Sequence, residues 1–180
     1  DKTLLGVTLT AAQFGAANAF FIFLLAPPFA LLWTRLSKAG WEPATPVKFS
    51  LGIAQAGLGF GALVYGAQFP DEAGMVSAWW LVLAYLLHTM GELCLSPVGL
   101  SAVTKLAVPS VVGVMMGTWF LASAYSSYVA AQIATVAAQP VNAENVNVSD
   151  ALSAYTDLFG QLLSIGLAGA AALLLLSPLL

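Results

Sequence analysis

The residues best suited to chemistry share one face of an apolar stretch that runs from residue 77 to residue 105. His88, Glu92 and Ser96 are spaced by four, so in a helix they follow one another about 40° apart around the axis. An imidazole, a carboxylate and a hydroxyl on one face could bind a polar substrate, relay protons or assist catalysis. Cys94 lies two residues from Glu92 and points roughly the opposite way.

Glu92 needs a specific environment because its neighbours in the sequence are apolar. A charged side chain at the centre of a membrane costs about 2.5 to 3.5 kcal/mol on insertion scales, so it usually faces a partner charge, a cavity or a transport path. A structural salt bridge is the plain alternative, but no Lys or Arg of this sequence lies at a matching depth. We therefore interpret Glu92 as a group that binds substrate or protons.

The other chemical roles on this face have weaker support. His88 is a candidate proton relay to Glu92, but a hydrogen bond inside the helix bundle is the favoured interpretation. His88 and Glu92 supply two metal ligands where three or four are needed, so no metal site is predicted. Ser96 and Cys94 lack a base and an orienting third group, so we predict no catalytic residue and no enzyme activity.

Two further residues inside apolar segments can make polar contacts. Asn18 can donate and accept hydrogen bonds, either toward a ligand or toward another helix. Trp119 can form the wall of a pocket or simply pack. Spacing alone does not decide between these roles.

The composition indicates a membrane protein. Of the 180 residues, 60% are hydrophobic and only 7% are charged, and the mean hydropathy is +0.91. A net charge of -3 with scattered cations excludes a basic nucleic-acid surface, so no nucleic-acid partner is predicted. The chain begins at Asp1 without a signal-peptide pattern, which favours a segment of a longer chain.

Apolar runs of about 20 residues predict an all-α, multi-pass protein of the lipid bilayer. Five membrane spans are expected, separated by short polar breaks. They cover approximately residues 10–36, 47–69, 77–106, 110–138 and 150–176.

Proline and glycine residues predict where these helices bend or approach one another. Pro27 and Pro28 should kink or locally unwind the first span, and Pro97 should bend the third. Small residues let helices pack closely, so close contacts are expected at two sets of glycines. The sets are Gly57, Gly59 and Gly61 in the second span and Gly113 and Gly117 in the fourth.

Positive charges predict the orientation of the spans. Four of the five cations, Arg35, Lys38, Lys48 and Lys105, fall on one side of the predicted bundle. By the positive-inside rule this side is cytoplasmic, so the segment before the first span lies outside.

A family resemblance rests on motifs of the third and fourth spans. The pattern is dense between Tyr85 and Ala124, and residues 18–27, NAFFIFLLAP, match more loosely. It resembles the proton-coupled oligopeptide transporters of the major facilitator superfamily. The residues that carry it are Gly91-Glu92-Leu93, Ser96-Pro97-Val98-Gly99-Leu100-Ser101, Thr104-Lys105-Leu106, Met115-Met116-Gly117 and Trp119-Phe120-Leu121.

The resemblance implies that the five spans are helices eight to twelve of a twelve-helix transporter, whose helix seven and N-terminal half lie outside this sequence. Glu92 would meet the amino terminus of a peptide, and Asn18, Ser96 and Trp119 would line the pocket. Pro97, Gly113 and Gly117 would let the cytoplasmic helix ends flex as a gate.

The implied function is proton-driven symport of di- and tripeptides across the cell membrane, the inner membrane of a bacterium, with the proton as coupling ion and no cofactor. Two alternatives stay open. A carrier of the same fold could move another substrate such as nitrate or a drug. A membrane enzyme would need its catalytic groups outside this sequence.

Overall fold

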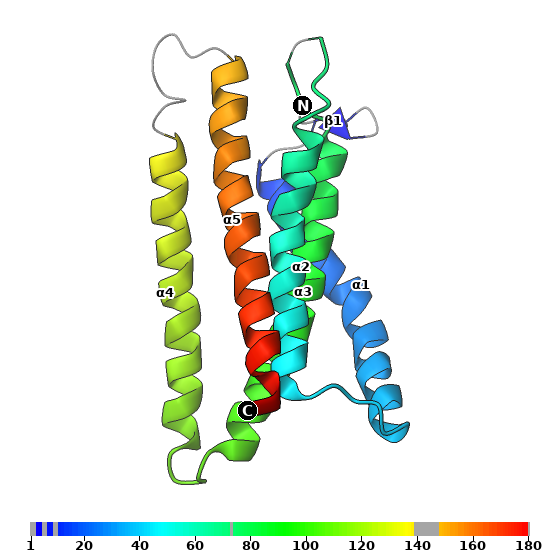
Figure 1. Ribbon diagram of the computed structural model, residues 1–180, viewed down its shortest axis with the longest axis vertical. Coiled ribbons are helices and arrows are strands. Elements are labelled where there is room, and N and C mark those ends of the chain that lie inside the picture. The colour runs from blue at the N-terminus through cyan, green and yellow to red at the C-terminus, as the bar shows by residue number, and fades with distance from the viewer. Residues whose placement is uncertain (1–2, 5–6, 9–10, 73, 139–147, 180) are drawn as a thin grey trace.

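The computed structural model describes residues 3–4, 7–8, 11–72, 74–138 and 148–179, and these consist almost entirely of helices (Figure 1). The long helices coincide with the predicted apolar runs, which agrees with the all-α fold class. They are α1 (Ala11–Lys38), α2 (Thr45–Gly66), α3 (Ala78–Leu106), α4 (Val112–Ala138) and α5 (Val148–Leu176). A 3-10 turn, η2 (Ser177–Leu179), follows α5. Before α1, strands β1 (Thr3–Leu4) and β2 (Val7–Thr8) form a two-residue antiparallel ladder.

Helices α2, α3 and α5 form the tightly packed part of the bundle, with α2 in contact with both of the others. The buried apolar side chains of this part are mostly small, and they include Ala78, Ala84 and Ala170. Large apolar side chains such as Phe23 and Leu175 lie instead on the outer surface. This arrangement is typical of membrane helices, whose backbones pack closely through small residues while bulky ones face lipid.

Glycines set the closest approaches inside this packed part. A Cβ added at Gly91 of α3 would lie 2.6 Å from the carbonyl oxygen of Gly52 in α2. One added at Gly166 of α5 would lie 2.9 Å from the Cα of Gly57. The predicted close packing at Gly57 is therefore confirmed, and Gly59 likewise leaves room for the His88 ring.

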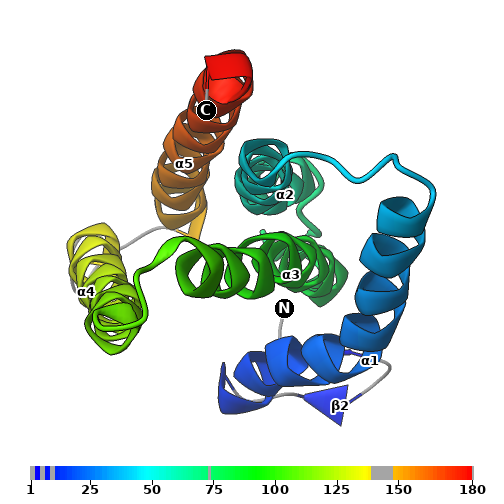
Figure 2. The same ribbon diagram turned by 90° about the horizontal axis from the view of Figure 1, so that it is seen from below.

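Helices α1 and α4 lie on opposite sides of α3 and flank the packed part (Figure 2). Every described side chain from Phe120 to Thr135 of α4 is exposed. The predicted close-approach face at Gly113 and Gly117 is not used within the described residues, because nothing lies within 4 Å of a Cβ added at either glycine. A glycine pattern marks a surface that permits close contact, but it does not supply the partner.

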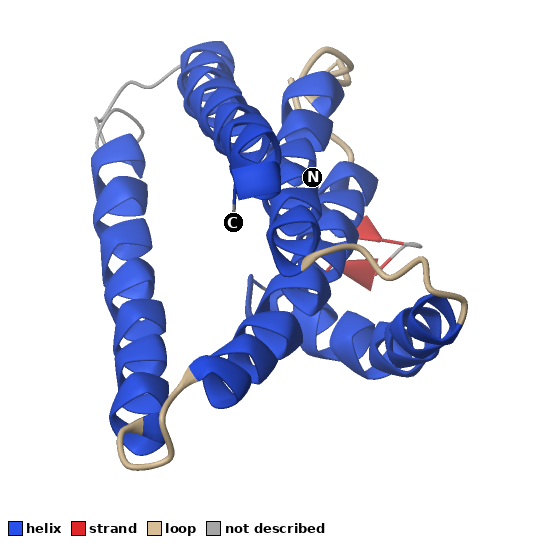
Figure 3. Ribbon diagram, turned by 60° about the horizontal axis from the view of Figure 1, so that its bottom comes forward, coloured by secondary structure: helices blue, strands red, loops and turns tan. Residues whose placement is uncertain are grey.

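The helices continue through their internal prolines. α1 bends strongly along its course, as expected for a helix that contains Pro27 and Pro28, but residues 11–38 stay helical, so the alternative of local unwinding is not realised (Figure 2). α3 is also unbroken at Pro97, and its last turns lead away from α2 toward α4 (Figure 3).

Four of the described helices, α1, α2, α3 and α5, are long and apolar enough to cross a membrane. The fourth predicted span also forms a long helix, α4, but its polar residues keep it outside this group. Hydroxyls of α4 bond to carbonyls of their own helix, for example Thr118 to Val114 at 2.9 Å and Ser127 to Ser123 at 3.1 Å. Such bonds reduce the cost of placing hydroxyls in lipid.

Candidate functional site

The structure brings together Asn18 of α1 and Glu92 of α3, although 74 residues separate them. The Asn18 Nδ2 group donates a hydrogen bond of 3.4 Å to Glu92 Oε2. Glu92 is exposed on the face of the bundle, and it forms no ion pair within the described part of the chain. The carboxylate is therefore held by a neutral amide and keeps capacity to accept further hydrogen bonds.

Thr89 completes this cluster and was not identified from the sequence. Its side chain is fully buried, with 0% exposure, and its Oγ1 donates to Asn18 Oδ1 at 2.6 Å. The same hydroxyl lies 2.8 Å from the carbonyl of Tyr85 in its own helix. Because Asn18 accepts through Oδ1 and donates through Nδ2, the two bonds together define which way its amide faces.

The sequence contains a signal for Thr89. It precedes Glu92 by three residues, and side chains three apart share a helix face. A threonine in an apolar run attracts little attention, because its hydroxyl can bond to a carbonyl in the preceding turn. Only a second polar residue at the same depth, Asn18 of another helix, shows that the position is more than a tolerated hydroxyl.

Ser96 lies farther along α3, and Trp119 of α4 packs against α3 farther still from Glu92. Ser96 is half-buried one turn after Glu92. The Trp119 ring of α4 packs directly over Gly99, where an added side chain would collide with it. Gly99 follows Glu92 by two turns, about 10 Å along the helix axis. Trp119 therefore covers this later part of α3 but does not reach the Asn18–Glu92 pair through Gly99.

His88 and Cys94 face α2 rather than the cluster. The His88 Nε2 atom is 3.0 Å from the carbonyl oxygen of Ala56, which can only accept, so Nε2 donates this bond. The ring also lies 4.7 Å from that of Phe60, centroid to centroid. The buried Cys94 thiol donates weakly to Gln55 Oε1 at 3.8 Å. The favoured interpretation of His88 as a hydrogen-bonding group inside the bundle agrees with this contact, and the relay to Glu92 stays a prediction.

The cluster can recognise a cation. An exposed carboxylate that is oriented by an amide accepts charge-assisted hydrogen bonds from an ammonium group. The chain places such a carboxylate on α3 beside Asn18 of α1, and sites between helices near the middle of the membrane are common in transporters. Within the described residues, the one hydroxyl of this cluster, that of Thr89, bonds to an amide and a backbone carbonyl rather than to a base.

Comparison with known proteins gives a consistent picture. The family model described as POT family matches residues 1–152. The uncharacterized transporter YclF of Bacillus subtilis is 42% identical over 97% of this chain and 32% of its own length. A dipeptide and tripeptide permease B of Aeromonas hydrophila is 34% identical over 97% of this chain and 35% of its own.

Solved structures agree with these relatives. A crystal structure of a variant of peptide transporter POT in complex with alafosfalin has 35% sequence identity and a TM-score of 0.78. The match covers 99% of this chain and 33% of that one. The chain thus spans about a third of the length of the relatives it matches.

Proposed function

Because the chain belongs to the POT family, we propose that it forms helices eight to twelve of a transporter that carries di- and tripeptides together with protons. It is a multi-pass protein of the cell membrane. The proposed activity is transport rather than catalysis. The N-terminal half of the same transporter is the proposed partner of this bundle, and the proton is the coupling ion.

The observation that carries the proposal is the hydrogen-bonded pair of Asn18 and Glu92. A peptide at neutral pH is a zwitterion, so its site needs an anion for the ammonium end and a cation for the carboxylate end. Glu92 supplies the anion, and within the described residues no cation lies beside it. We propose that the N-terminal half supplies the cationic part of the site.

The proposed transport mechanism is alternating access, which a site shared between two halves supports. Substrate would bind near the midplane between two halves that rock against each other. Peptide and protons enter from outside, and the peptide ammonium competes with a lysine of the N-terminal half for Glu92. Loading then loosens one gate and favours closure of the other, with Ser96 and Trp119 lining the pocket.

The proposed gate uses Pro97 on α3 and the glycines Gly113 and Gly117 on α4. Pro97 lies inside α3, two residues before the Gly99 that Trp119 covers, and both glycines face open space within the described residues. Small residues and a proline give these helix ends room to move. Cross-linking the two ends should stop transport, and unchanged transport after cross-linking would contradict the gate.

The test is uptake of labelled dialanine into proteoliposomes that contain the full transporter, driven by an inward proton gradient. The wild type should accumulate dialanine, and Glu92→Gln should lose uptake because an amide cannot pair with the ammonium. Asp157→Asn is the matched control, since it removes an exposed carboxylate of α5 outside the cluster, and it should retain uptake.

The outcomes separate the parts of this proposal. Uptake by both the wild type and Glu92→Gln would make Glu92 structural. No uptake of dialanine by either protein would overturn the peptide assignment while leaving the fold intact. Uptake that does not respond to the proton gradient would overturn proton coupling alone.

A further inference from the structure

A second polar site lies at the end of the bundle that the positive charges predict to be cytoplasmic, away from the Asn18–Glu92 pair. A cavity of about 250 Å³ opens there between α1, α2 and α3. Its polar lining consists of Trp33, Glu42, Thr45, Lys48, Ser101 and Lys105. A neighbouring cavity of about 400 Å³ shares Trp33, Glu42 and Lys105 and adds Lys38. The two cavities gather three lysines around one tryptophan.

The charge balance at this end is strongly positive. Four of the five Lys and Arg residues of the chain lie here, and Glu42 is the one acidic residue of the segment 33–48. Helix α2 also begins at this cavity, and it has no acidic residue in its first turn and no side-chain cap. The positive end of its dipole adds to the field of the lysines.

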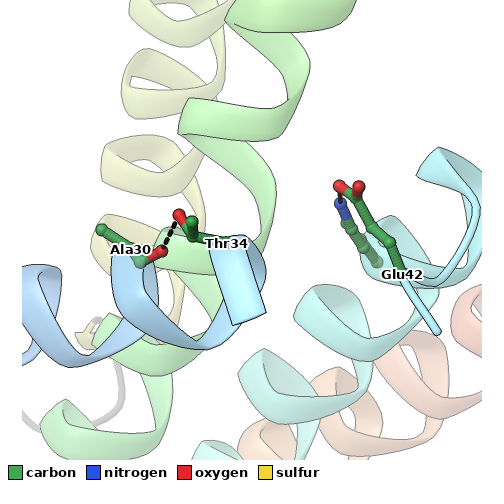
Figure 4. Close-up of polar contacts among 4 residues, drawn as sticks. Ala30, Thr34 and Glu42 are labelled. Atoms are coloured by element: carbon green, nitrogen blue, oxygen red, sulfur yellow. Dashed lines mark hydrogen bonds and ion pairs between the residues drawn. The ribbon is translucent and has the colours of Figure 1, made fainter. Parts of the chain in front are cut away.

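Lys48 is the most constrained of these cations. It is only 6% exposed, its Nζ lies 4.8 Å from the centroid of the Trp33 ring, and it donates a hydrogen bond of 2.5 Å to Glu42 Oε1. Glu42 itself is 41% exposed and lies in the loop between α1 and α2, and Figure 4 shows it apart from the turn of α1 in which Thr34 bonds to Ala30. A buried ammonium is thus paired with a carboxylate that is partly exposed to solvent.

Trp33 adds an unpaired hydrogen-bond donor to this part of the bundle. Its indole Nε1 is buried and has no acceptor among the described residues, where it is the one such side-chain atom. Buried donors are nearly always paired, and an unpaired one is stabilised by any acceptor that reaches it. An incoming oxyanion would find two lysines and the hydroxyls of Thr45 and Ser101 around one cavity, and Trp33, which carries this donor, is part of the same lining.

We propose that this cavity binds the phosphate group of an anionic ligand. Glu42, which pairs with Lys48, competes with that phosphate for the Lys48 ammonium group. A phosphate matches the number and charge of the donors, since it offers several acceptor oxygens and carries a negative charge. Two sources share this chemistry, an anionic phospholipid and free inorganic phosphate. The position favours the lipid, because basic pockets between helices at the cytoplasmic side of a membrane bind lipid head groups.

The test is a native mass spectrometry titration of the full transporter in detergent with short-chain phosphatidylglycerol. Trp33→Phe and Lys105→Gln should each weaken binding by about tenfold, as expected for loss of a hydrogen bond to a charged group. Glu42→Gln should tighten binding, because it removes the competing carboxylate. Arg35→Gln is the matched control: it removes a cation from the same end that lines neither cavity, and it should leave binding within about twofold.

A second titration with inorganic phosphate distinguishes the two sources. If phosphate alone binds with the same pattern across the four variants, the ligand is soluble phosphate. If only phosphatidylglycerol does, the ligand is the lipid. The proposal is overturned if neither ligand binds the wild type, if Arg35→Gln weakens binding as much as Lys105→Gln, or if Glu42→Gln weakens it. Lys105 is exposed, so its variant keeps the test valid if Trp33→Phe does not fold.

Discussion

The three packed helices α2, α3 and α5 differ sharply from the flanking helices α1 and α4. In the packed part, glycines bring backbones into contact and a buried hydroxyl crosses from Ser50 to the carbonyl of Ala170 at 2.7 Å. In α4, hydroxyls bond within their own helix and side chains are exposed. The packed helices therefore hold one another on several sides, whereas α1 and α4 contact the bundle mainly through α3.

The candidate site is divided between these two regions. Glu92 and Thr89 belong to α3, whereas Asn18 and Trp119 belong to the flanking helices. Binding groups on a rigid element keep a defined geometry, and groups on loosely held helices can change their distance from it. The comparison teaches that the candidate site joins a carboxylate of the packed helix α3 to an amide of the flanking helix α1.

The largest effect is expected at Gly91, where α3 touches α2. Gly91→Ala places a methyl group 2.6 Å from the carbonyl oxygen of Gly52, and the backbones must separate, which should lower the free energy of unfolding by about 1 to 3 kcal/mol. Gly117→Ala is the control, because nothing lies within 4 Å of its added Cβ. Thermal unfolding of the purified transporter in detergent measures both. An equal loss for Gly117→Ala would contradict the contrast between the regions.

A smaller loss is expected from the hydroxyl that joins α2 to α5. Ser50→Ala removes the buried bond to Ala170 and should lower the free energy of unfolding by about 1 kcal/mol. Ser164→Ala removes a hydroxyl that is exposed and bonds to Gly160 in its own helix, so its effect should be near zero. The same thermal measurement distinguishes the two, and a neutral Ser50→Ala would show that the bond contributes nothing to the packing.

Thr89 tests how the parts of the site on α3 and α1 are connected. Thr89→Val keeps the shape but removes the donor to Asn18 Oδ1, a bond between helices of the kind worth about 0.6 kcal/mol in membranes. The dialanine concentration for half-maximal uptake should rise about threefold. Thr118→Val, which removes a bond within α4 only, is the control. Loss of stability without a change in this concentration would make Thr89 purely structural.

The smallest effect concerns Glu42, in the loop between α1 and α2. The hydrogen bond from Lys48, followed by one from Ser37, lowers the pKa of the Glu42 carboxyl below its ordinary value of 4.5. A lowered pKa in the folded state means that ionised Glu42 contributes stability above pH 4.5, and that this contribution is lost as the pH falls through the folded-state pKa.

The wild type should therefore unfold at a slightly higher temperature than Glu42→Gln at neutral pH, and the difference should disappear as the pH falls well below 4.5. Glu72→Gln, at the opposite end of α2, controls for removal of an exposed carboxylate. If the difference in unfolding temperature between the wild type and Glu42→Gln grew toward acid pH, the lowered pKa of Glu42 would be contradicted.

The sequence predicted the helices well because their signal is local. A run of about 20 apolar residues has few alternatives to a membrane helix. The glycines of α2 were equally readable, since their partners lie in this chain. Gly113 and Gly117 have the same appearance, but a spacing pattern contains no information about which surface covers it.

The candidate site was predicted only in part, because single residues can be recognised from the sequence but their pairings cannot. Glu92 is conspicuous because a charge in an apolar run is costly, and Asn18 follows as a strong polar group at depth. Their contact depends on how α1 crosses α3, which no periodicity specifies. Thr89 and the cavity around Lys48 were missed, because both depend on pairings between residues distant in sequence.

The contact of α5 with α2 has a consequence for biogenesis. Ser50 and Ala170 are 120 positions apart, so α2 is synthesised and inserted long before its second neighbour. Until α5 enters the membrane, the Ser50 hydroxyl and the surface around Gly57 remain open to lipid or to insertion factors. Helices α2 and α3 can pair as they emerge, but the packed core of α2, α3 and α5 closes only when α5 arrives, and quality control has that interval in which to recognise an incomplete bundle.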